Sequence, residues 1–162
     1  MSQNPIKVGI ADMKTALSPY SIVTTGLGSC VGVCIWDAGT RIGGMVHVML
    51  PESSLGTTSM NKAKYADTGI NLLVEEILKI GGVKVRLTAK IAGGAQMFSF
   101  PGSNSVMRIG ERNVEAVKLT LEQLRIKIIA EDTGGNFGRT IEFFTANGLL
   151  HVKTISRGEK VL

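Results

Sequence analysis

Cys30-Val-Gly-Val-Cys-Ile-Trp36 is the stretch that decides the fold, because its residues alternate in the manner of a β-strand. The turn-forming run Asp37-Ala-Gly-Thr40 follows it and leads into a second alternating segment, residues 42–49. Shorter strand-like segments precede it at residues 6–12 and 21–25. The first third of the chain is therefore expected to form a β-meander.

The rest of the chain mixes helices with strands. Residues 62–80 have apolar side chains at helical spacing and end at Gly81-Gly82, and residues 111–124 form a second helix. Further strands are expected at residues 83–91, 126–131, 141–145 and 149–155, and Asn147-Gly148 predicts a type I′ turn between the last two. One α+β domain over residues 1–162 follows, with helices on one side of largely antiparallel sheet and a second sheet layer.

Composition and charge exclude several classes of protein. Apolar residues make up 44% and charged residues 19% of 162 residues, as in globular domains. No apolar run reaches the length of a membrane span, and the N-terminus lacks the pattern of a signal peptide, so we expect a cytoplasmic protein without membrane insertion. The net charge of +5 is spread along the chain and aromatic residues are only 5%, which argues against nucleic-acid binding.

Cys30 is the candidate nucleophile of an active site. It stands at the mouth of its strand, directly after the glycine-containing run Thr24-Thr-Gly-Leu-Gly-Ser29. A cysteine there can attack a carbonyl while backbone N–H groups around Gly28 and Ser29 hold the oxyanion. The alternative is a tight turn followed by a buried cysteine, and spacing alone favours that alternative.

His47 lies in the next strand and is expected to come close to Cys30 across the hairpin. A cysteine and a histidine at hydrogen-bond distance make the smallest activated thiol nucleophile. A histidine buried in the core is a comparable interpretation. A third group that orients the base has three candidates, which the residues alone do not separate: Thr24, Thr25 and Ser29.

A metal site is an alternative use of the same side chains. Cys30, Cys34, His47 and His151 are four possible ligands, but structural zinc sites usually take closely spaced pairs from turns rather than from mid-strand positions. The two cysteines lie four residues apart on one strand, about 13 Å, which is too far for a disulfide. We therefore expect free thiols and neither metal nor cofactor.

Two further glycine-rich loops and one apolar cluster complete the candidate sites. Gly93 with Gly94, and Gly134 with Gly135, are expected to wall a groove around Cys30, although simple tight turns explain them equally well. The apolar cluster is a candidate partner-binding surface, or else it folds back onto the core. Its members are Met97, Phe98 and Phe100.

Six runs in order resemble the chemoreceptor glutamine deamidases, the CheD family of bacterial and archaeal chemotaxis, over nearly the whole chain. These runs are Thr24-Thr-Gly-Leu-Gly-Ser-Cys30, Gly44-Met-Val-His-Val-Met-Leu-Pro51, Lys64-Tyr-Ala-Asp67, Lys90-Ile-Ala-Gly-Gly-Ala-Gln-Met-Phe98, Arg112-Asn-Val-Glu-Ala-Val117 and Ala130-Glu-Asp-Thr-Gly-Gly-Asn136. Each run is weak alone, but their order and spacing together are specific.

The resemblance implies a layered α/β/β sandwich similar to cysteine-dependent toxin deamidase domains. It implies Cys30 as nucleophile, His47 as base and Thr24 as the third member. The implied substrates are glutamine side chains on the cytoplasmic domains of methyl-accepting chemoreceptors, and the implied partner is a CheC-type phosphatase. The alternative is a non-catalytic adaptor that binds chemoreceptors and the CheC phosphatase, because a fold does not prove an activity. A different cysteine hydrolase, such as an esterase or a transglutaminase, is a third hypothesis.

Overall fold

The computed structural model describes residues 4–53, 61–97 and 108–162. Within these residues the chain forms ten strands, two α-helices and two 3₁₀ turns. In chain order they are β1 (Ile6–Lys7), β2 (Met13–Leu17), β3 (Ser21–Leu27), β4 (Val31–Asp37), β5 (Ile42–Val48), η1 (Lys62–Lys64), α1 (Ala66–Lys79), η2 (Lys84–Arg86), β6 (Leu87–Gly93), α2 (Ile109–Gln123), β7 (Lys127–Thr133), β8 (Arg139–Phe144), β9 (Leu150–Thr154) and β10 (Gly158–Val161).

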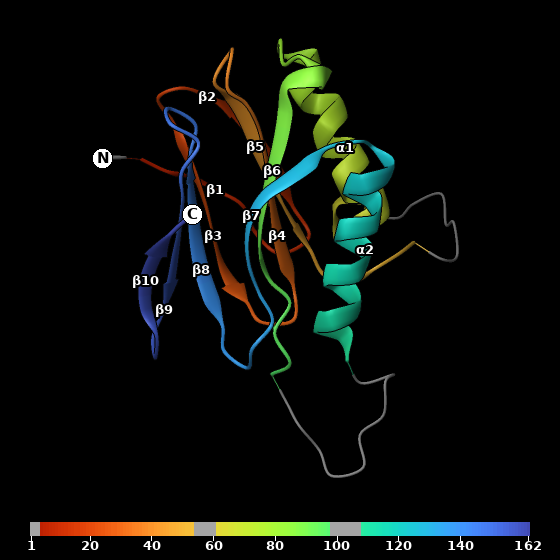
Figure 1. Cartoon of the computed structure of the whole chain (residues 1–162), viewed down its shortest axis with the longest axis vertical. Coiled ribbons are helices and arrows are strands. Elements are labelled where there is room, and N and C mark those ends of the chain that lie inside the picture. Colours follow the sequence, from red (N-terminus) through yellow and green to blue (C-terminus); the bar gives the residue numbers. More distant parts are fainter. Residues whose placement is uncertain (1–3, 54–60, 98–107) are drawn as a thin grey trace.

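The elements stack in three layers. The central sheet has the strand order β2-β5-β4-β6-β7, and the outer sheet has the order β1-β3-β8-β9-β10. Both α-helices cover one face of the central sheet, while the outer sheet covers its other face (Figure 1). Only the pairs β1–β3 and β6–β7 are parallel among the described strands. The expected layered α/β/β sandwich of largely antiparallel sheets with two main helices is confirmed.

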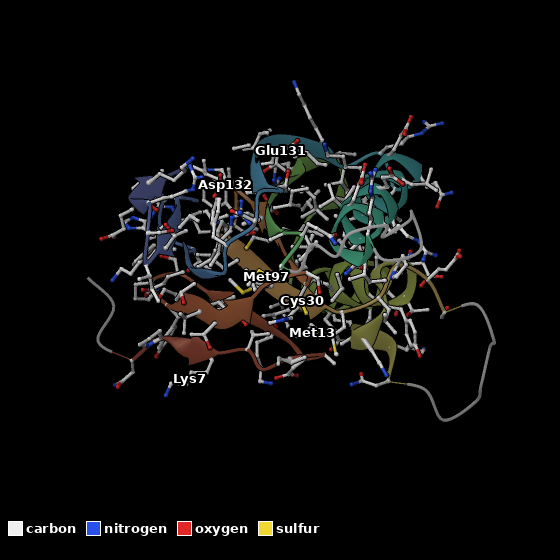
Figure 2. The ribbon with its side chains drawn as sticks, turned by 90° about the horizontal axis from the view of Figure 1, so that it is seen from below. Lys7, Met13, Cys30, Met97, Glu131 and Asp132 are labelled. Carbon is white, nitrogen blue, oxygen red and sulfur yellow. The ribbon has the colours of Figure 1, made fainter. Side chains whose placement is uncertain are left out.

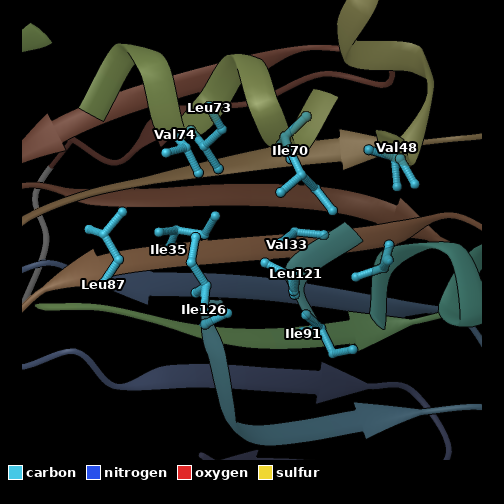
Figure 3. Close-up of a cluster of buried hydrophobic side chains, with 14 of the residues drawn as sticks. Val33, Ile35, Val48, Ile70, Leu73, Val74, Leu87, Ile91, Leu121 and Ile126 are labelled. Carbon is cyan, nitrogen blue, oxygen red and sulfur yellow. The ribbon is translucent and has the colours of Figure 1, made fainter. Parts of the chain in front are cut away.

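The middle strand β4 contributes to two cores because its side chains alternate between the faces of the central sheet. Val33 and Ile35 point toward the helices, where they pack with Leu73 of α1 and Leu121 of α2 (Figure 3). Cys34, between them in the sequence, belongs to the core between the two sheets. Burial of each large aliphatic side chain contributes roughly 1.5–3 kcal/mol to folding. Both faces of β4 are therefore shielded from water.

The expected β-meander is wrong in its connectivity. β3 belongs to the outer sheet and β4 to the central sheet, so the run between them crosses from one layer to the other. β2 pairs with β5 at the edge of the central sheet, and β1 is only two residues long. Local alternation predicts a strand but does not say which sheet it joins, and that choice depends on contacts made far along the chain.

The turn at Asn147-Gly148 also differs from expectation. Gly148 has a φ of +74°, whereas Asn147 is not among the residues with positive φ, so the turn is not type I′. The Gly148 N–H instead donates to the Phe144 carbonyl at 2.8 Å, which closes a longer loop. A β-carbon at Gly148 would lie 2.4 Å from the Trp36 ring. Packing against the central sheet thus sets this turn.

Candidate active site

The deepest part of the site is a hydrogen bond between the two sheets. Thr24 lies on β3 of the outer sheet and His47 on β5 of the central sheet, and both are buried. The Thr24 Oγ1 atom lies 2.8 Å from His47 Nδ1. It also lies 2.7 Å from the Val8 carbonyl oxygen, to which it donates. A residue that precedes Cys30 by six positions thus reaches His47 through the fold of the sandwich.

This arrangement fixes the tautomer of His47. A threonine hydroxyl has one proton, and the Thr24 proton is directed to the Val8 carbonyl. Thr24 Oγ1 must therefore accept the proton on Nδ1 of His47, which leaves Nε2 unprotonated. The Nε2 atom is buried and has no hydrogen-bond partner within the described residues. The imidazole is held with its basic nitrogen free.

Cys30 lies on the same face of the central sheet as His47. Gly32 of β4 pairs directly with His47, and Cys30 precedes Gly32 by two residues, so it is the diagonal neighbour of His47 on that face. Cys30 packs against the core between the sheets and is partly exposed. Gly32 contributes no side chain to the space opposite the imidazole. A β-carbon there would lie 2.6 Å from Cδ1 of Ile141.

Burial makes the resting pair electrically neutral. Desolvation lowers the pKa of His47 to about 4, so the imidazole is uncharged at neutral pH. Desolvation also raises the pKa of the Cys30 thiol, with a smaller opposing effect from the backbone N–H of Cys30 itself. A neutral imidazole can accept a proton from a thiol, which is the step that activates a cysteine nucleophile.

Sequence comparison places the chain among known proteins. The family model for CheD chemotactic sensory transduction matches residues 49–154. A probable chemoreceptor glutamine deamidase of Desulfitobacterium hafniense is 52% identical over 159 residues, which is 98% of this chain and 99% of that protein. The chemoreceptor glutamine deamidase of Bacillus subtilis is 49% identical over 97% of this chain and 95% of its own. The chain belongs to the CheD family. The corresponding protein of Halalkalibacterium halodurans is 52% identical over 96% of both chains.

Three of the runs that carry the CheD resemblance meet at the site. The run from Thr24 to Cys30 crosses between the sheets, and the run containing His47 forms β5 beside it. The end of β6 packs against the first of these runs, because a β-carbon at Gly93 would lie 2.3 Å from the Cys30 carbonyl oxygen. Gly93 thus supports the backbone of the candidate nucleophile.

The other glycines of the expected groove lie next to the site. Gly94, Gly134 and Gly135 line a cavity of about 460 Å³ beside the start of α2. Within the described part of the chain, the lining of this cavity includes neither Cys30 nor His47. The cavity therefore adjoins the candidate nucleophile rather than containing it.

The apolar cluster is described only in part. Met97 is 42% exposed and its side chain covers Gly28, where a β-carbon would lie 3.0 Å from the Met97 Cγ atom. Met97 and Cys30 both lie at the end of the sandwich where β3 connects to β4 (Figure 2). Phe98 and Phe100 lie outside the described residues. Met97 is thus an exposed thioether beside the loop that precedes Cys30.

The remaining candidate ligands are scattered. Cys34 is buried, and desolvation raises the pKa of its thiol far above the ordinary value. His151 lies on the outer sheet, and its ring packs at a tilt of 54° against Phe144 with ring centroids 4.7 Å apart. No cluster of three or more His, Cys, Asp or Glu side chains suited to a metal ion occurs among the described residues. Neither described helix is long and apolar enough to cross a membrane.

Asn113 contacts the site but was not among the residues expected from the sequence. It is fully buried on α2, and its Nδ2 atom lies 2.9 Å from the Ser29 carbonyl oxygen. The only signal for it was its place in the run from Arg112 to Val117, whose apolar residues suggested packing alone.

Proposed function

We propose that this chain is a cysteine-dependent protein-glutamine deamidase that converts glutamine side chains of methyl-accepting chemoreceptors to glutamate and releases ammonia. The observation that carries the proposal is the free Nε2 of His47, fixed by Thr24 on the face of the sheet that also holds Cys30. The names of the relatives supply the substrate class, since they are chemoreceptor glutamine deamidases.

The first half of the reaction forms a thioester. His47 Nε2 takes the thiol proton of Cys30 as the sulfur attacks the carboxamide carbon. The Gly28 N–H already donates to the Gly26 carbonyl at 3.1 Å, so the oxyanion donors are the backbone N–H groups of Ser29 and Cys30. The tetrahedral intermediate then collapses, the C–N bond breaks, and the imidazolium gives its proton to the departing ammonia.

The second half restores the enzyme. Neutral His47 takes a proton from water, and the resulting hydroxide adds to the thioester carbon. The C–S bond breaks, the proton returns to the Cys30 sulfur, and the product is a glutamate side chain. Thr24 holds Nδ1 protonated throughout, so Nε2 carries every proton transfer. The mechanism uses neither a metal nor an organic cofactor.

The surroundings of Cys30 suggest how a receptor segment is held. We place the backbone next to the target glutamine in the groove walled by Gly94, Gly134 and Gly135, where glycine permits close approach. Met97, together with Phe98 and Phe100, would contact the receptor or a CheC-type phosphatase. These partners act in the cytoplasm, where free thiols are stable.

Peptide mass spectrometry of a chemoreceptor cytoplasmic fragment tests the proposal. Incubation with the wild-type protein should convert discrete glutamines to glutamates, and Cys30→Ala should abolish the conversion. Cys34→Ala is the matched control, because it removes the other thiol, which is buried away from solvent. Conversion that persists with Cys30→Ala would refute the cysteine mechanism. Binding of the fragment without any conversion would instead establish a non-catalytic adaptor.

A further inference from the structure

Every carbonyl of the nucleophile loop, residues 28–30, is held by a donor from another part of the chain. The Ala95 N–H donates to the carbonyl of residue 28 at 2.8 Å, and the Gly94 N–H donates to that of residue 30 at 2.8 Å. The carbonyl between them, on residue 29, accepts from the side chain of Asn113 at 2.9 Å. Two of these donors are backbone groups, and the third is the only one that a substitution removes cleanly.

Asn113 donates both protons of its amide, one to the segment before β4 and one to the segment after β5. Its Nδ2 atom donates to the Ser29 carbonyl and also, at 2.9 Å, to the carbonyl of Met49. Its Oδ1 atom is buried without a partner within the described residues. The opposite orientation of the amide would place Oδ1 against two carbonyl oxygens, so the orientation is fixed. Asn113 thus serves the loop solely as a pair of N–H donors.

The hydrogen bond from Asn113 to the Ser29 carbonyl also orients the Cys30 N–H, because both groups belong to the same peptide plane. The Ser29 carbonyl and the Cys30 N–H belong to one planar trans peptide and point in opposite directions. Asn113 stands on α2, on the helix side of the central sheet, and draws the carbonyl toward that side. The Cys30 N–H therefore points away from the Asn113 amide that holds the Ser29 carbonyl.

We propose that Asn113 is a positioning residue that aims the Cys30 N–H at the developing oxyanion of the tetrahedral intermediate. This inference rests on the proposed function. Pre-oriented N–H donors stabilise an oxyanion without the cost of reorganising during the reaction. Without Asn113, the Ser29–Cys30 peptide can rotate, so the Cys30 N–H no longer points at the oxyanion. The thiol and His47 stay in place. The role concerns the transition state rather than substrate binding.

Asn113→Asp is the sharpest variant because it keeps the shape of the side chain and replaces the two N–H donors by an acceptor. Asn113→Ser is a second variant that leaves at most one donor. Removal of one oxyanion donor lowers kcat by roughly 100- to 1,000-fold. Misorientation of the Cys30 N–H, which stays present, should therefore lower kcat by roughly 10- to 100-fold. KM for the chemoreceptor fragment should change less than about threefold.

Alkylation of Cys30 by iodoacetamide separates this role from general damage to the site. That reaction is a substitution at a saturated carbon, it develops no oxyanion, and it depends only on the thiol and its surroundings. Its rate should stay within about threefold of wild type while kcat falls. Thr120→Val is the matched control. Thr120 is another buried polar residue of α2, and its hydroxyl donates only to the Ala116 carbonyl of the same helix. Its kcat should match wild type.

The outcomes discriminate between the explanations. A large fall in kcat in either folded Asn113 variant, with KM and the alkylation rate preserved, would support the positioning role. An unchanged kcat in a folded variant, or equal losses in kcat and alkylation rate, would overturn it. Cys30→Ala is assayed in parallel. An inactive Cys30→Ala beside a fully active Asn113→Asp would refute this inference alone, whereas an active Cys30→Ala would refute the proposed mechanism together with it.

Discussion

The buried imidazole of His47 should make the folded state sensitive to mild acid. Its pKa is about 4 in the folded protein against an ordinary value of 6.5. At pH 7 the group is neutral in both states and contributes no difference. As the pH falls below about 6.5, the unfolded chain binds a proton that the folded chain does not, so the free energy of unfolding decreases until the pH reaches about 4.

The size of the effect follows from the two pKa values. At about 1.4 kcal/mol per pKa unit, protonation of the unfolded state should remove about 3 kcal/mol of stability in total, and about 2 kcal/mol of this between pH 7 and pH 4.5. Urea unfolding at the two pH values, followed by the fluorescence of the single tryptophan Trp36, measures it. Carboxylates also titrate in this range, so His47→Gln serves as the reference that retains them.

Wild type should lose about 2 kcal/mol more than His47→Gln between pH 7 and pH 4.5. Equal losses in the two proteins would refute the argument that burial holds His47 neutral. The same reasoning applies to the proposed mechanism, in which His47 is the base and acts only when neutral. The acid limb of kcat/KM should therefore lie near pH 4, as set by His47 in the free enzyme, and a limb near pH 6.5 would contradict it.

Three further predictions follow from the geometry of the site. Thr24→Val should lower kcat roughly 10- to 100-fold by releasing the tautomer of the base, whereas Thr24→Ser, which keeps the hydroxyl, should remain active in the fragment assay. Gly32→Ala should destabilise the fold by about 1–3 kcal/mol in urea unfolding, because the new methyl group meets Ile141. Iodoacetamide should modify Cys30 at least roughly tenfold faster than the buried Cys34, and equal rates by peptide mapping would argue against a reactive nucleophile.

Local sequence patterns predicted an element well where its apolar residues all lie on one face, as in the two helices. The expected helix over residues 62–80 corresponds to η1 and α1, and the expected helix over residues 111–124 corresponds to α2. Their apolar spacing alone fixes which side is buried. The strand expected from residue 83 begins only at Leu87, after the 3₁₀ turn η2, because the Asp37 carboxylate binds the Val83 N–H and the Arg86 guanidinium. That contact joins positions 46 and 49 residues apart, so no local pattern contains it.

The end of the chain shows a second limit of prediction from local sequence patterns. The strand β10 was not expected, since Gly158–Val161 has no buried residue and no alternating apolar pattern. It pairs with β9 through its backbone alone. Hydrogen bonds between main chains are nearly independent of side-chain identity, so a sequence pattern cannot reveal such an edge strand.

The sequence by itself determined an α+β domain with a second sheet layer, because the spacing of apolar residues fixes its elements. The layered α/β/β sandwich was implied by the resemblance of six sequence runs to the CheD family. The sequence also placed a cysteine after a glycine-containing run and a histidine in the following strand. Local pattern left Thr24, Thr25 and Ser29 open, and only the resemblance to a family pointed to Thr24. The tertiary structure brings Thr24 to His47, because β3 leaves the meander and joins the outer sheet. It also brought Asn113 from a helix to the loop before Cys30. Hydrogen bonds between layers depend on how whole sheets and helices stack, and that stacking is a property of the complete core rather than of any one segment.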